Sequence, residues 1–225
     1  MVPSSPSLPH VEAWIFDLDN TLYPSSSRLF DQVSRRITLF LMSLFQIDEA
    51  GARERQRALF RRHGTTLRGL MLEHGVEPSE FLDFVHDIDV AVMAPAPLLD
   101  QALANLGGRK LVFTNGSVPH AERILERLGI GRHFEAIHDI VASDYVPKPD
   151  PAPYLALIER HGIEAERTAM VEDMAINLKP AHALGMTTVW VKTEHDWAAP
   201  GEDAGHIHYR TDDLPAWLEG VASYR

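Results

Sequence analysis

Two aspartates, Asp17 and Asp19, stand one residue apart directly after the apolar run 14–16. A short apolar run bounded by polar residues is typical of a buried strand, so both carboxylates are expected at a strand end. Neighbouring carboxylates repel each other, and a cation or a proton is needed to offset their charge. The spacing alone is not diagnostic, because Asp87 and Asp89 repeat it without a strand before them.

Other polar residues follow later apolar runs or precede a helix: Thr114 and Asn115, Lys148, and Glu172 with Asp173. Ligands of open parallel sheets bind outside the carboxyl ends of the strands, so we expect these side chains to meet Asp17 and Asp19 in one crevice. Four carboxylates there are typical of a hard-cation site, and Mg²⁺ is the expected ion. A lysine and a threonine hydroxyl beside it favour a bound phosphoryl group.

The segments that must position these residues alternate between strands and helices. Apolar runs occur at 14–16, 111–113, 137–141, 169–171 and 188–191. The helical stretches between the later runs end at glycine, the usual left-handed cap. This alternation predicts an α/β fold with a doubly wound parallel sheet and helices on both faces.

Residues 24–97 break the alternation. Apolar residues recur at three- and four-residue steps from Leu29 to Leu44, and Asp48 and Ser79 are suitable N-caps for further helices. We expect an all-helical cap at 24–97, inserted into a core made of 11–23 and 98–225. Residues 1–10 are expected to form a disordered leader rich in proline and serine.

Four groups of residues resemble, in order and rough spacing, the four motifs of the haloacid dehalogenase-like (HAD) superfamily: residues 17–21, Thr114 with Asn115, residues 148–151, and Glu172 with Asp173 followed by Asn177. The resemblance covers nearly the whole chain. It implies a Rossmann-like core with an inserted helical cap of the C1 type. Residues 16–24 and 63–70 look most like the pyrimidine 5′-nucleotidase group of that superfamily.

The resemblance implies catalytic roles for Asp17, Asp19 and Lys148. Asp17 would form an aspartyl-phosphate, and Asp19 would protonate the leaving oxygen and later activate water. Mg²⁺ would be bound by four residues: Asp17 and Asp173 through carboxylates, Asp19 through its backbone carbonyl, and Glu172 directly or through water. The phosphoryl oxygens would be held by three residues: Thr114, Asn115 and Lys148.

The fourth motif departs from the family pattern at two positions. It often ends with an acid where this chain has Asn177, and Glu172 stands where many members have glycine or serine. An amide can still accept a hydrogen bond from a metal-bound water or orient Lys148. We therefore expect rearranged surroundings of the metal and not a lost site.

Four residues of the cap side are candidate substrate contacts: Tyr23, Thr65, Thr66 and Arg68. Tyr23 directly follows the first motif and could either stack on a base or pack the hinge of the cap. Arg68 and the two threonines follow the expected helix end at Gly64, where a loop can reach the crevice. The basic run at 53–62 is expected to be a solvated helix face.

Composition limits the partners and the location. The formal net charge of −11 argues against binding to nucleic acid or anionic membranes through bulk charge. The absence of cysteine excludes disulfides and thiolate zinc sites. The longest apolar stretch, 39–45, is too short to span a membrane, and the start lacks a secretory signal, so a cytoplasmic protein is expected. The oligomeric state stays open between monomer and homodimer.

The motifs together predict a Mg²⁺-dependent phosphomonoesterase acting on a small phosphorylated metabolite, with a pyrimidine nucleoside 5′-monophosphate as the preferred substrate. A phosphatase of small sugar phosphates or phosphoglycolate is an alternative, as is a phosphomutase. A non-enzymatic module that binds a phosphorylated ligand is a further alternative, although such a module has little reason to keep clustered carboxylates. A dehalogenase is disfavoured, because that chemistry in the family lacks an acid at the position of Asp19.

Overall fold

The computed structural model describes residues 7–194 and 205–222. Within these residues, six strands form one parallel sheet in the order β3-β2-β1-β4-β5-β6. In chain order they are β1 (Ala13–Phe16), β2 (Arg109–Phe113), β3 (Ala136–His138), β4 (Thr168–Glu172), β5 (Thr187–Val191) and β6 (Tyr209–Thr211). The predicted α/β fold with a doubly wound parallel sheet is confirmed.

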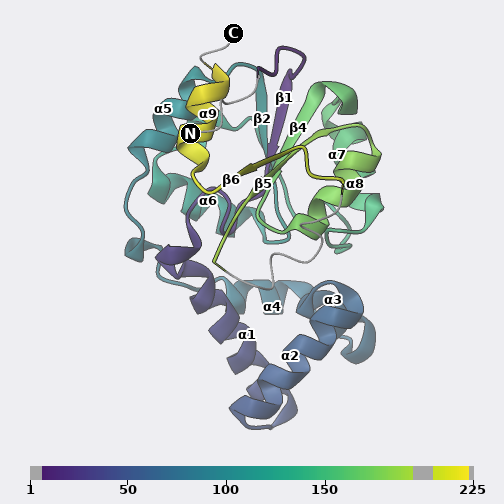
Figure 1. Cartoon of the computed structure of the whole chain (residues 1–225). Helices are drawn as coiled ribbons and strands as arrows, with labels where there is room; N and C mark the ends of the chain where they lie inside the picture. Colours follow the sequence, from purple (N-terminus) through teal and green to yellow (C-terminus); the bar gives the residue numbers. More distant parts are fainter. Residues whose placement is uncertain (1–6, 195–204, 223–225) are drawn as a thin grey trace.

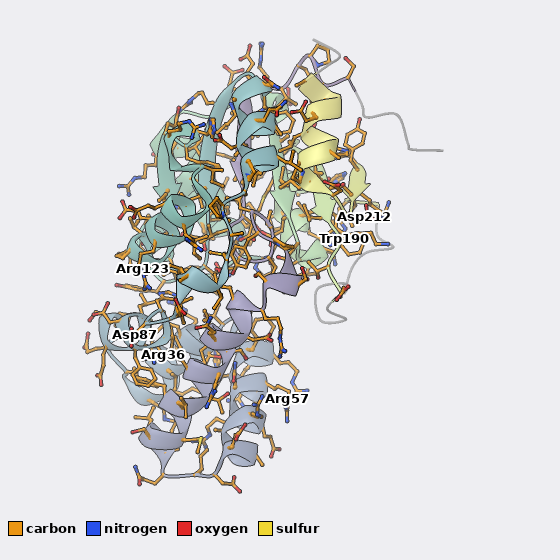
Figure 2. The ribbon with its side chains drawn as sticks, turned by 90° about the vertical axis from the view of Figure 1, so that its left-hand side faces the viewer. Arg36, Arg57, Asp87, Arg123, Trp190 and Asp212 are labelled. Carbon is orange, nitrogen blue, oxygen red and sulfur yellow. The ribbon has the colours of Figure 1, made fainter. Side chains whose placement is uncertain are left out.

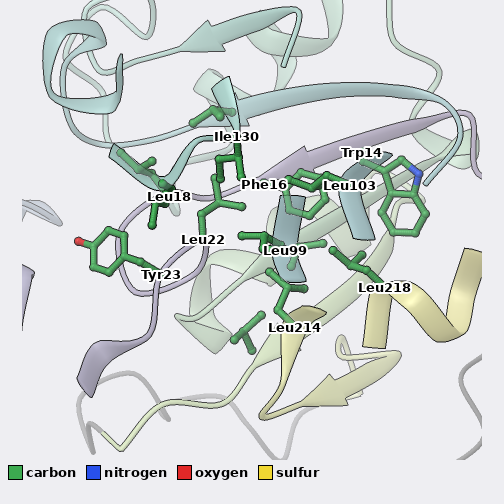
Figure 3. Packing of buried hydrophobic residues seen from close by; sticks show 14 of the residues in the cluster. Trp14, Phe16, Leu18, Leu22, Tyr23, Leu99, Leu103, Ile130, Leu214 and Leu218 are labelled. Atoms are coloured by element: carbon green, nitrogen blue, oxygen red, sulfur yellow. The ribbon is translucent and has the colours of Figure 1, made fainter. Parts of the chain in front are cut away.

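Helices cover both faces of the sheet (Figure 1). One face carries α5 (Pro97–Asn105), α6 (Val118–Leu128) and α9 (Leu214–Ala222), and the other carries α7 (Pro151–His161) and α8 (Leu178–Ala183). Strand β1 supplies both cores in alternation, because successive side chains of a strand point to opposite faces. Trp14 and Phe16 pack with the first group (Figure 3). Ala13 and Ile15 pack with the second.

Four helices between β1 and β2 form a separate layer, here called the helical lobe (residues 29–85). They are α1 (Leu29–Phe45), α2 (Glu49–His63), α3 (Thr66–His74) and α4 (Pro78–Val85). The lobe extends beyond the carboxyl end of β1 (Figures 1 and 2). It has its own apolar core, in which Leu41 and Leu70 are fully buried.

The helix caps of the lobe were only partly predictable. Asp48 caps α2 as predicted, since its Oδ1 accepts from the Gly51 amide at 2.9 Å. The expectation that Ser79 caps a helix is wrong. Helix α4 begins two residues earlier than that expectation, with Pro78 as its first residue and Glu77 at the N-cap position. Proline suits this position because its missing N–H would have no partner there.

The structure differs from the predicted disordered leader at residues 7–10, the last part of that segment. Residues 1–6 lie outside the described residues, but Leu8 is only 3% exposed and packs into the core under β1. His10 Nε2 lies 3.1 Å from Thr187 Oγ1. Ordered structure therefore begins before residue 11. None of the described helices is long and apolar enough to cross a membrane.

Candidate active site

Asp17 lies at the topological switch point of the sheet. The strand order runs β1, β2, β3 to one edge and β4, β5, β6 to the other, so it reverses between β1 and β4. The Asp17 amide donates to the Val171 carbonyl at 2.9 Å, which continues the pairing of these two strands by one residue. Ligands of such sheets bind in the crevice outside this point.

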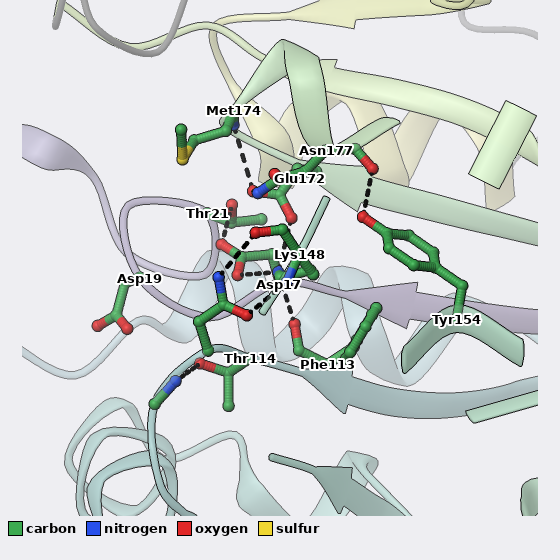
Figure 4. A network of polar contacts seen from close by, with 12 residues as sticks. Asp17, Asp19, Thr21, Phe113, Thr114, Lys148, Tyr154, Glu172, Met174 and Asn177 are labelled. Atoms are coloured by element: carbon green, nitrogen blue, oxygen red, sulfur yellow. Dashed lines mark hydrogen bonds and ion pairs between the residues drawn. The ribbon is translucent and has the colours of Figure 1, made fainter. Parts of the chain in front are cut away.

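Both carboxylate oxygens of Asp17 are held in place. Thr21 Oγ1 donates to Oδ2 at 2.8 Å, and Lys148 Nζ donates to Oδ1 at 2.7 Å (Figure 4). Burial, and next the charge of Glu172, raise the pKa of Asp17 to about 7, although Lys148 opposes the shift. The orientation suits a nucleophile, and a further positive charge would keep this carboxyl ionised.

Lys148 is a buried ammonium shared by three acceptors. Besides Asp17, its Nζ donates to Glu172 Oε2 at 2.7 Å and to the Phe113 carbonyl at 2.9 Å. Burial by itself would lower the pKa of Lys148, but the two carboxylates raise it above its ordinary value, so the group stays charged. Its backbone is bound by Asn115, whose Oδ1 accepts from the Lys148 amide at 2.9 Å and whose Nδ2 donates to the carbonyl at 3.5 Å.

Three carboxylates form a compact acidic cluster. Asp17, Glu172 and Asp173 each offer an oxygen, and these oxygens lie within 4.8 Å of one another. Asp173 Oδ2 is buried and has no hydrogen-bond partner among the described residues. Burial, followed by the charges of Glu172 and Asp17, raises the pKa of Asp173 well above its ordinary value. An unpartnered buried oxygen in such a cluster fits a divalent cation that binds oxygen ligands.

Asn177 holds one member of this cluster. Its Nδ2 donates to Glu172 Oε1 at 3.2 Å, and the Met174 amide donates to the same oxygen at 3.3 Å. The Tyr154 hydroxyl in turn donates to the Asn177 carbonyl at 2.6 Å. The amide therefore orients Glu172 and reaches Lys148 only through that carboxylate.

The Asp19 side chain stands apart from the network around Lys148 (Figure 4). Its Oδ1 accepts from the Tyr23 hydroxyl at 2.6 Å and lies 3.0 Å from His120 Nε2. Burial alone would raise the pKa of Asp19, but the charge of His120 and the hydrogen bonds from His120 and Tyr23 lower it below its ordinary value. Asp19 is thus an ionised carboxylate at neutral pH in this arrangement.

The predicted phosphate-binding residues lie beside the cluster. Thr114 is 1% exposed, and its Oγ1 accepts from the Gly116 amide at 2.9 Å, which leaves the hydroxyl proton available for another acceptor. The Asn115 side chain is engaged by the backbone of Lys148. The phosphate contacts themselves stay predictions.

Three of the four predicted substrate contacts at the cap have structural roles in the chain itself, and their contact with a substrate stays a prediction. Tyr23 is 2% exposed and packs in the core (Figure 3), so its ring offers no open face to a base and the hinge-packing alternative is supported. Thr65 caps α3, since its Oγ1 accepts from the Arg68 amide at 3.2 Å. Thr66 is buried in the first turn of that helix.

Arg68 lines a groove of about 350 Å³ between the lobe and the loop 146–150 that carries Lys148. The lobe approaches this loop closely at Gly64, whose φ is +81° and whose Cβ would lie 3.1 Å from Pro147 Cγ. Among the described residues, no carboxylate pairs with the Arg68 guanidinium. A larger hollow of about 750 Å³ beside α6 and β3 contains none of the predicted site residues.

Two residues that contact the aspartates were not predicted from the sequence. Thr21 lies within the first motif, and its spacing of four residues from Asp17 gave no separate signal. His120 lies six residues after Thr114, in the first turn of α6. A search for titratable residues in the first turn after each strand end would have found it.

Comparison with known proteins agrees with this geometry. Residues 11–185 match the family described as haloacid dehalogenase-like hydrolase. A protein named phosphoglycolate phosphatase from Mesorhizobium japonicum is 31% identical over 188 residues, which cover 79% of this chain and 81% of that protein. A protein named glyceraldehyde 3-phosphate phosphatase from Methanopyrus kandleri is 27% identical over 201 residues, which cover 81% of this chain and 84% of that protein.

A solved structure shares the fold. The crystal structure of CbbY from Rhodobacter sphaeroides in complex with phosphate superposes with a TM-score of 0.64 at 21% identity, covering 93% of this chain and 99% of that chain. The predicted resemblance to the superfamily is thus confirmed, and so is the prediction of a phosphatase. The finer resemblance to pyrimidine 5′-nucleotidases is not supported by these relatives. The chain belongs to the haloacid dehalogenase-like hydrolase family.

Proposed function

We propose that the protein is a Mg²⁺-dependent phosphomonoesterase that acts on a small phosphorylated metabolite through an aspartyl-phosphate on Asp17. One observation carries the proposal. The Asp17 carboxylate lies at the switch point between a buried ammonium, 2.7 Å away on Lys148, and the acidic cluster with Glu172 and Asp173. This arrangement pairs a nucleophile with the charges needed to bring a phosphate dianion against it.

Mg²⁺ is the cation that we propose for the acidic cluster. Asp17, Asp173 and the Asp19 backbone carbonyl would hold it, with Glu172 as a direct or water-mediated ligand. When bound, the ion supplies positive charge that offsets repulsion between the carboxylates and the phosphate and polarises the phosphoryl oxygens. The unpartnered Asp173 Oδ2 supports this assignment, because a buried carboxylate oxygen without a donor is costly unless a cation binds it.

The first half of the reaction forms a bond between an Asp17 oxygen and phosphorus and breaks the ester P–O bond. Lys148 neutralises part of the charge on the phosphoryl group, and Thr114 can donate its hydroxyl proton to a phosphoryl oxygen. The leaving oxygen takes a proton from Asp19. Asp19 must gain that proton beforehand, and the approach of a phosphate dianion favours this because a like charge raises the pKa of a carboxyl.

The second half returns Asp17 to its starting state. Asp19, now ionised, takes a proton from a water molecule, and the water oxygen attacks phosphorus. The bond between phosphorus and Asp17 breaks, and inorganic phosphate leaves. The sum of the two halves is hydrolysis of the ester, with both aspartates restored.

For the substrate, we favour a phosphorylated small carboxylic acid or sugar over a pyrimidine nucleotide. Relatives named phosphoglycolate phosphatase and glyceraldehyde 3-phosphate phosphatase support this choice. The burial of Tyr23 weakens the nucleotide alternative, since the ring cannot stack on a base. The Arg68 cation in the groove is suited to an anionic or hydroxylated group of the substrate.

We also propose that residues 24–97 act as a cap over a core of 11–23 and 98–225. A helical lobe at the carboxyl end of β1 can exclude water from the crevice and contact the leaving group. The cytoplasmic location expected from the sequence stays a prediction.

Phosphate release from a panel of monoesters tests the function. The panel contains phosphoglycolate, glyceraldehyde 3-phosphate, fructose 1-phosphate, UMP, CMP and AMP, each with Mg²⁺ and with EDTA. We expect release that requires Mg²⁺, is fastest for the acid or sugar phosphates, and is lost in Asp17→Asn. Preference for UMP and CMP would overturn the substrate choice. Isomerised product without free phosphate would indicate a phosphomutase, and no turnover of any ester would contradict the proposal.

A further inference from the structure

Two stacked histidines, His120 and His86, lie next to Asp19, and His120 contacts its carboxylate. His120 Nε2 lies 3.0 Å from Asp19 Oδ1, and its side chain is 1% exposed. The ring of His86 stacks on the ring of His120 with a centroid separation of 4.1 Å and an interplanar angle of 15°. Neither histidine has a part in the reaction described above.

The contacts of Asp19 are divided unequally between its two oxygens. Oδ1 accepts from Tyr23 and from His120, whereas Oδ2 has no hydrogen-bond partner among the described residues. A carboxylate oxygen can only accept, so Nε2 of His120 carries the hydrogen in this contact. Two donors on one oxygen fix the rotation of the carboxylate. The other oxygen is left for a proton on its way to the leaving group or from water.

The ring of His120 lies close to Gly116 and stacks on the ring of His86. It lies in the first turn of α6, directly after Pro119, where the backbone is restricted. A Cβ added to Gly116 would lie 3.0 Å from His120 Cδ2 and 3.7 Å from His86 Nε2. Gly116 and His86 therefore restrict the movement of the His120 ring.

His86 comes from the opposite part of the molecule. It is the residue directly after α4, and its Nδ1 lies 3.0 Å from Ser117 Oγ at the start of α6. Arg123 of α6 donates to the His86 carbonyl at 2.9 Å and to the Ile88 carbonyl at 2.6 Å. Figure 2 shows Arg123 at this junction between the lobe and the sheet layers.

We propose that His120 is a positioning residue that fixes the Asp19 carboxylate for proton transfer, and that His86 holds the His120 ring in place from the end of the helical lobe. The inference rests on the proposed function, because it assigns the geometry of the acid in that reaction. The lobe and the proton donor are thereby connected through two stacked rings. A lobe displaced from this position would take the His86 ring away from His120 and leave the His120 ring, and through it the Asp19 carboxylate, less restricted.

Leaving groups of different acidity test the proposal. An alkyl phosphate needs a proton on the departing oxygen, whereas p-nitrophenyl phosphate releases a stable phenolate and needs little help. We compare kcat/KM for p-nitrophenyl phosphate with that for the alkyl phosphate of the panel above that is hydrolysed fastest. This quantity reports the steps up to departure of the leaving group, so the later hydrolysis of the aspartyl-phosphate does not obscure it.

We expect His120→Leu to lower kcat/KM roughly 30- to 100-fold for the alkyl phosphate and less than about threefold for p-nitrophenyl phosphate. His120→Gln keeps a donor at similar reach and should restore most of the loss. His86→Leu should show a smaller loss with the same preference. His182→Leu is the matched control, because His182 also stacks on another histidine, His208. The His208 ring accepts a hydrogen bond from the Thr188 amide near the start of β5, at the end of the strand opposite the crevice.

The outcomes separate this inference from the proposed function. A native chain that hydrolyses neither ester would overturn the function, and the inference with it. An active native chain whose His120→Leu variant loses the same factor on both esters would overturn the inference alone, since that pattern indicates general structural damage. Equal activity of His120→Gln and His120→Leu on the alkyl ester would do the same. Thermal unfolding of each variant identifies loss of folding. If the His120 variants do not fold, His86→Leu tests the inference, and an equal loss on both esters in that variant would overturn it.

Discussion

The ammonium nitrogen of Lys148 lies 2.7 Å from Oδ1 of Asp17, and the side chain of this lysine is 1% exposed. The same nitrogen lies 2.7 Å from a carboxylate oxygen of Glu172, so one positive charge faces two negative ones. Asp173 adds a third carboxyl to the cluster. This excess of negative charge supports the proposed divalent cation, which would offset it.

Replacement of Lys148 by methionine should remove activity and stability together. Loss of the ammonium leaves Asp17 and Glu172 buried without their positively charged partner, which should lower the free energy of unfolding by about 3 kcal/mol in the absence of metal. Turnover should fall roughly 10²- to 10³-fold, because the phosphoryl charge loses its buried counter-ion. Denaturant titration and phosphate release measure the two effects. The exposed Lys179, changed to methionine, is the control and should leave both unchanged.

Mg²⁺ should stabilise the fold through the acidic cluster. An ion that binds only the folded chain adds about 2.7 kcal/mol at about 100 times its Kd, which corresponds to a rise in Tm of several degrees. Asp173→Asn should reduce that rise, while Asp212→Asn, at an exposed surface position (Figure 2), should keep it. Calorimetry of each variant with Mg²⁺ and with EDTA measures this rise in Tm. An equal rise in both variants would place the ion outside the cluster.

Arg68 should affect substrate binding more than chemistry. Its guanidinium lines the groove beside the Lys148 loop and has no carboxylate partner in the described part of the chain. We expect Arg68→Ala to raise KM for an acid or sugar phosphate roughly tenfold, with kcat changed less than about threefold. Arg57→Ala, on the exposed side of α2 (Figure 2), is the matched control. An unchanged KM would remove Arg68 from the substrate contacts.

His138 should make the fold sensitive to acid. Its ring is fully buried, and neither ring nitrogen has a hydrogen-bond partner within residues 7–194 and 205–222. Burial, followed by the charge of His161, lowers the pKa of His138 to about 4. Between the ordinary pKa of 6.5 and about 4, the unfolded chain binds a proton that the folded chain does not. Stability is therefore lost as the pH falls through this range, by about 1.4 kcal/mol for each pH unit from this group.

His138→Leu should remove that loss, because leucine has a similar volume and cannot be protonated. Denaturant titrations of the native chain and the variant between pH 7 and pH 4, with their difference plotted against pH, measure the effect. The free energy of unfolding of the variant should rise relative to that of the native chain as the pH falls. A difference that stays constant over the range would show that His138 does not titrate in the way the structure implies.

The core of the site could be predicted because motif order and fold support each other. Apolar runs predicted the parallel sheet, and the carboxyl ends of parallel strands meet at one edge, so Asp17, Lys148 and Asp173 had to converge. One expected strand was too long. The run 137–141 forms a strand only to His138, since the Asp139 side chain then accepts from the Val118 and Ala142 amides and turns the chain.

The contacts of the helical lobe could not be predicted in the same way. Tyr23 follows the first motif in sequence, yet its direction depends on how the chain packs after the turn, and the ring enters the core. The contact between His86 and His120 joins residues 34 positions apart and follows from the packing of the segment after α4 against α6. Local patterns hold no information about such packing between layers.

The stereochemistry at phosphorus tests the central claim most directly. The substrate is a thiophosphate ester whose phosphorus is made chiral by one sulfur atom and two different oxygen isotopes. It is hydrolysed in water that carries a third oxygen isotope, and the configuration of the released thiophosphate is determined. Two successive in-line displacements, first by Asp17 and then by water, predict net retention of configuration. Inversion would show that water attacks the ester directly and would contradict the aspartyl-phosphate on Asp17.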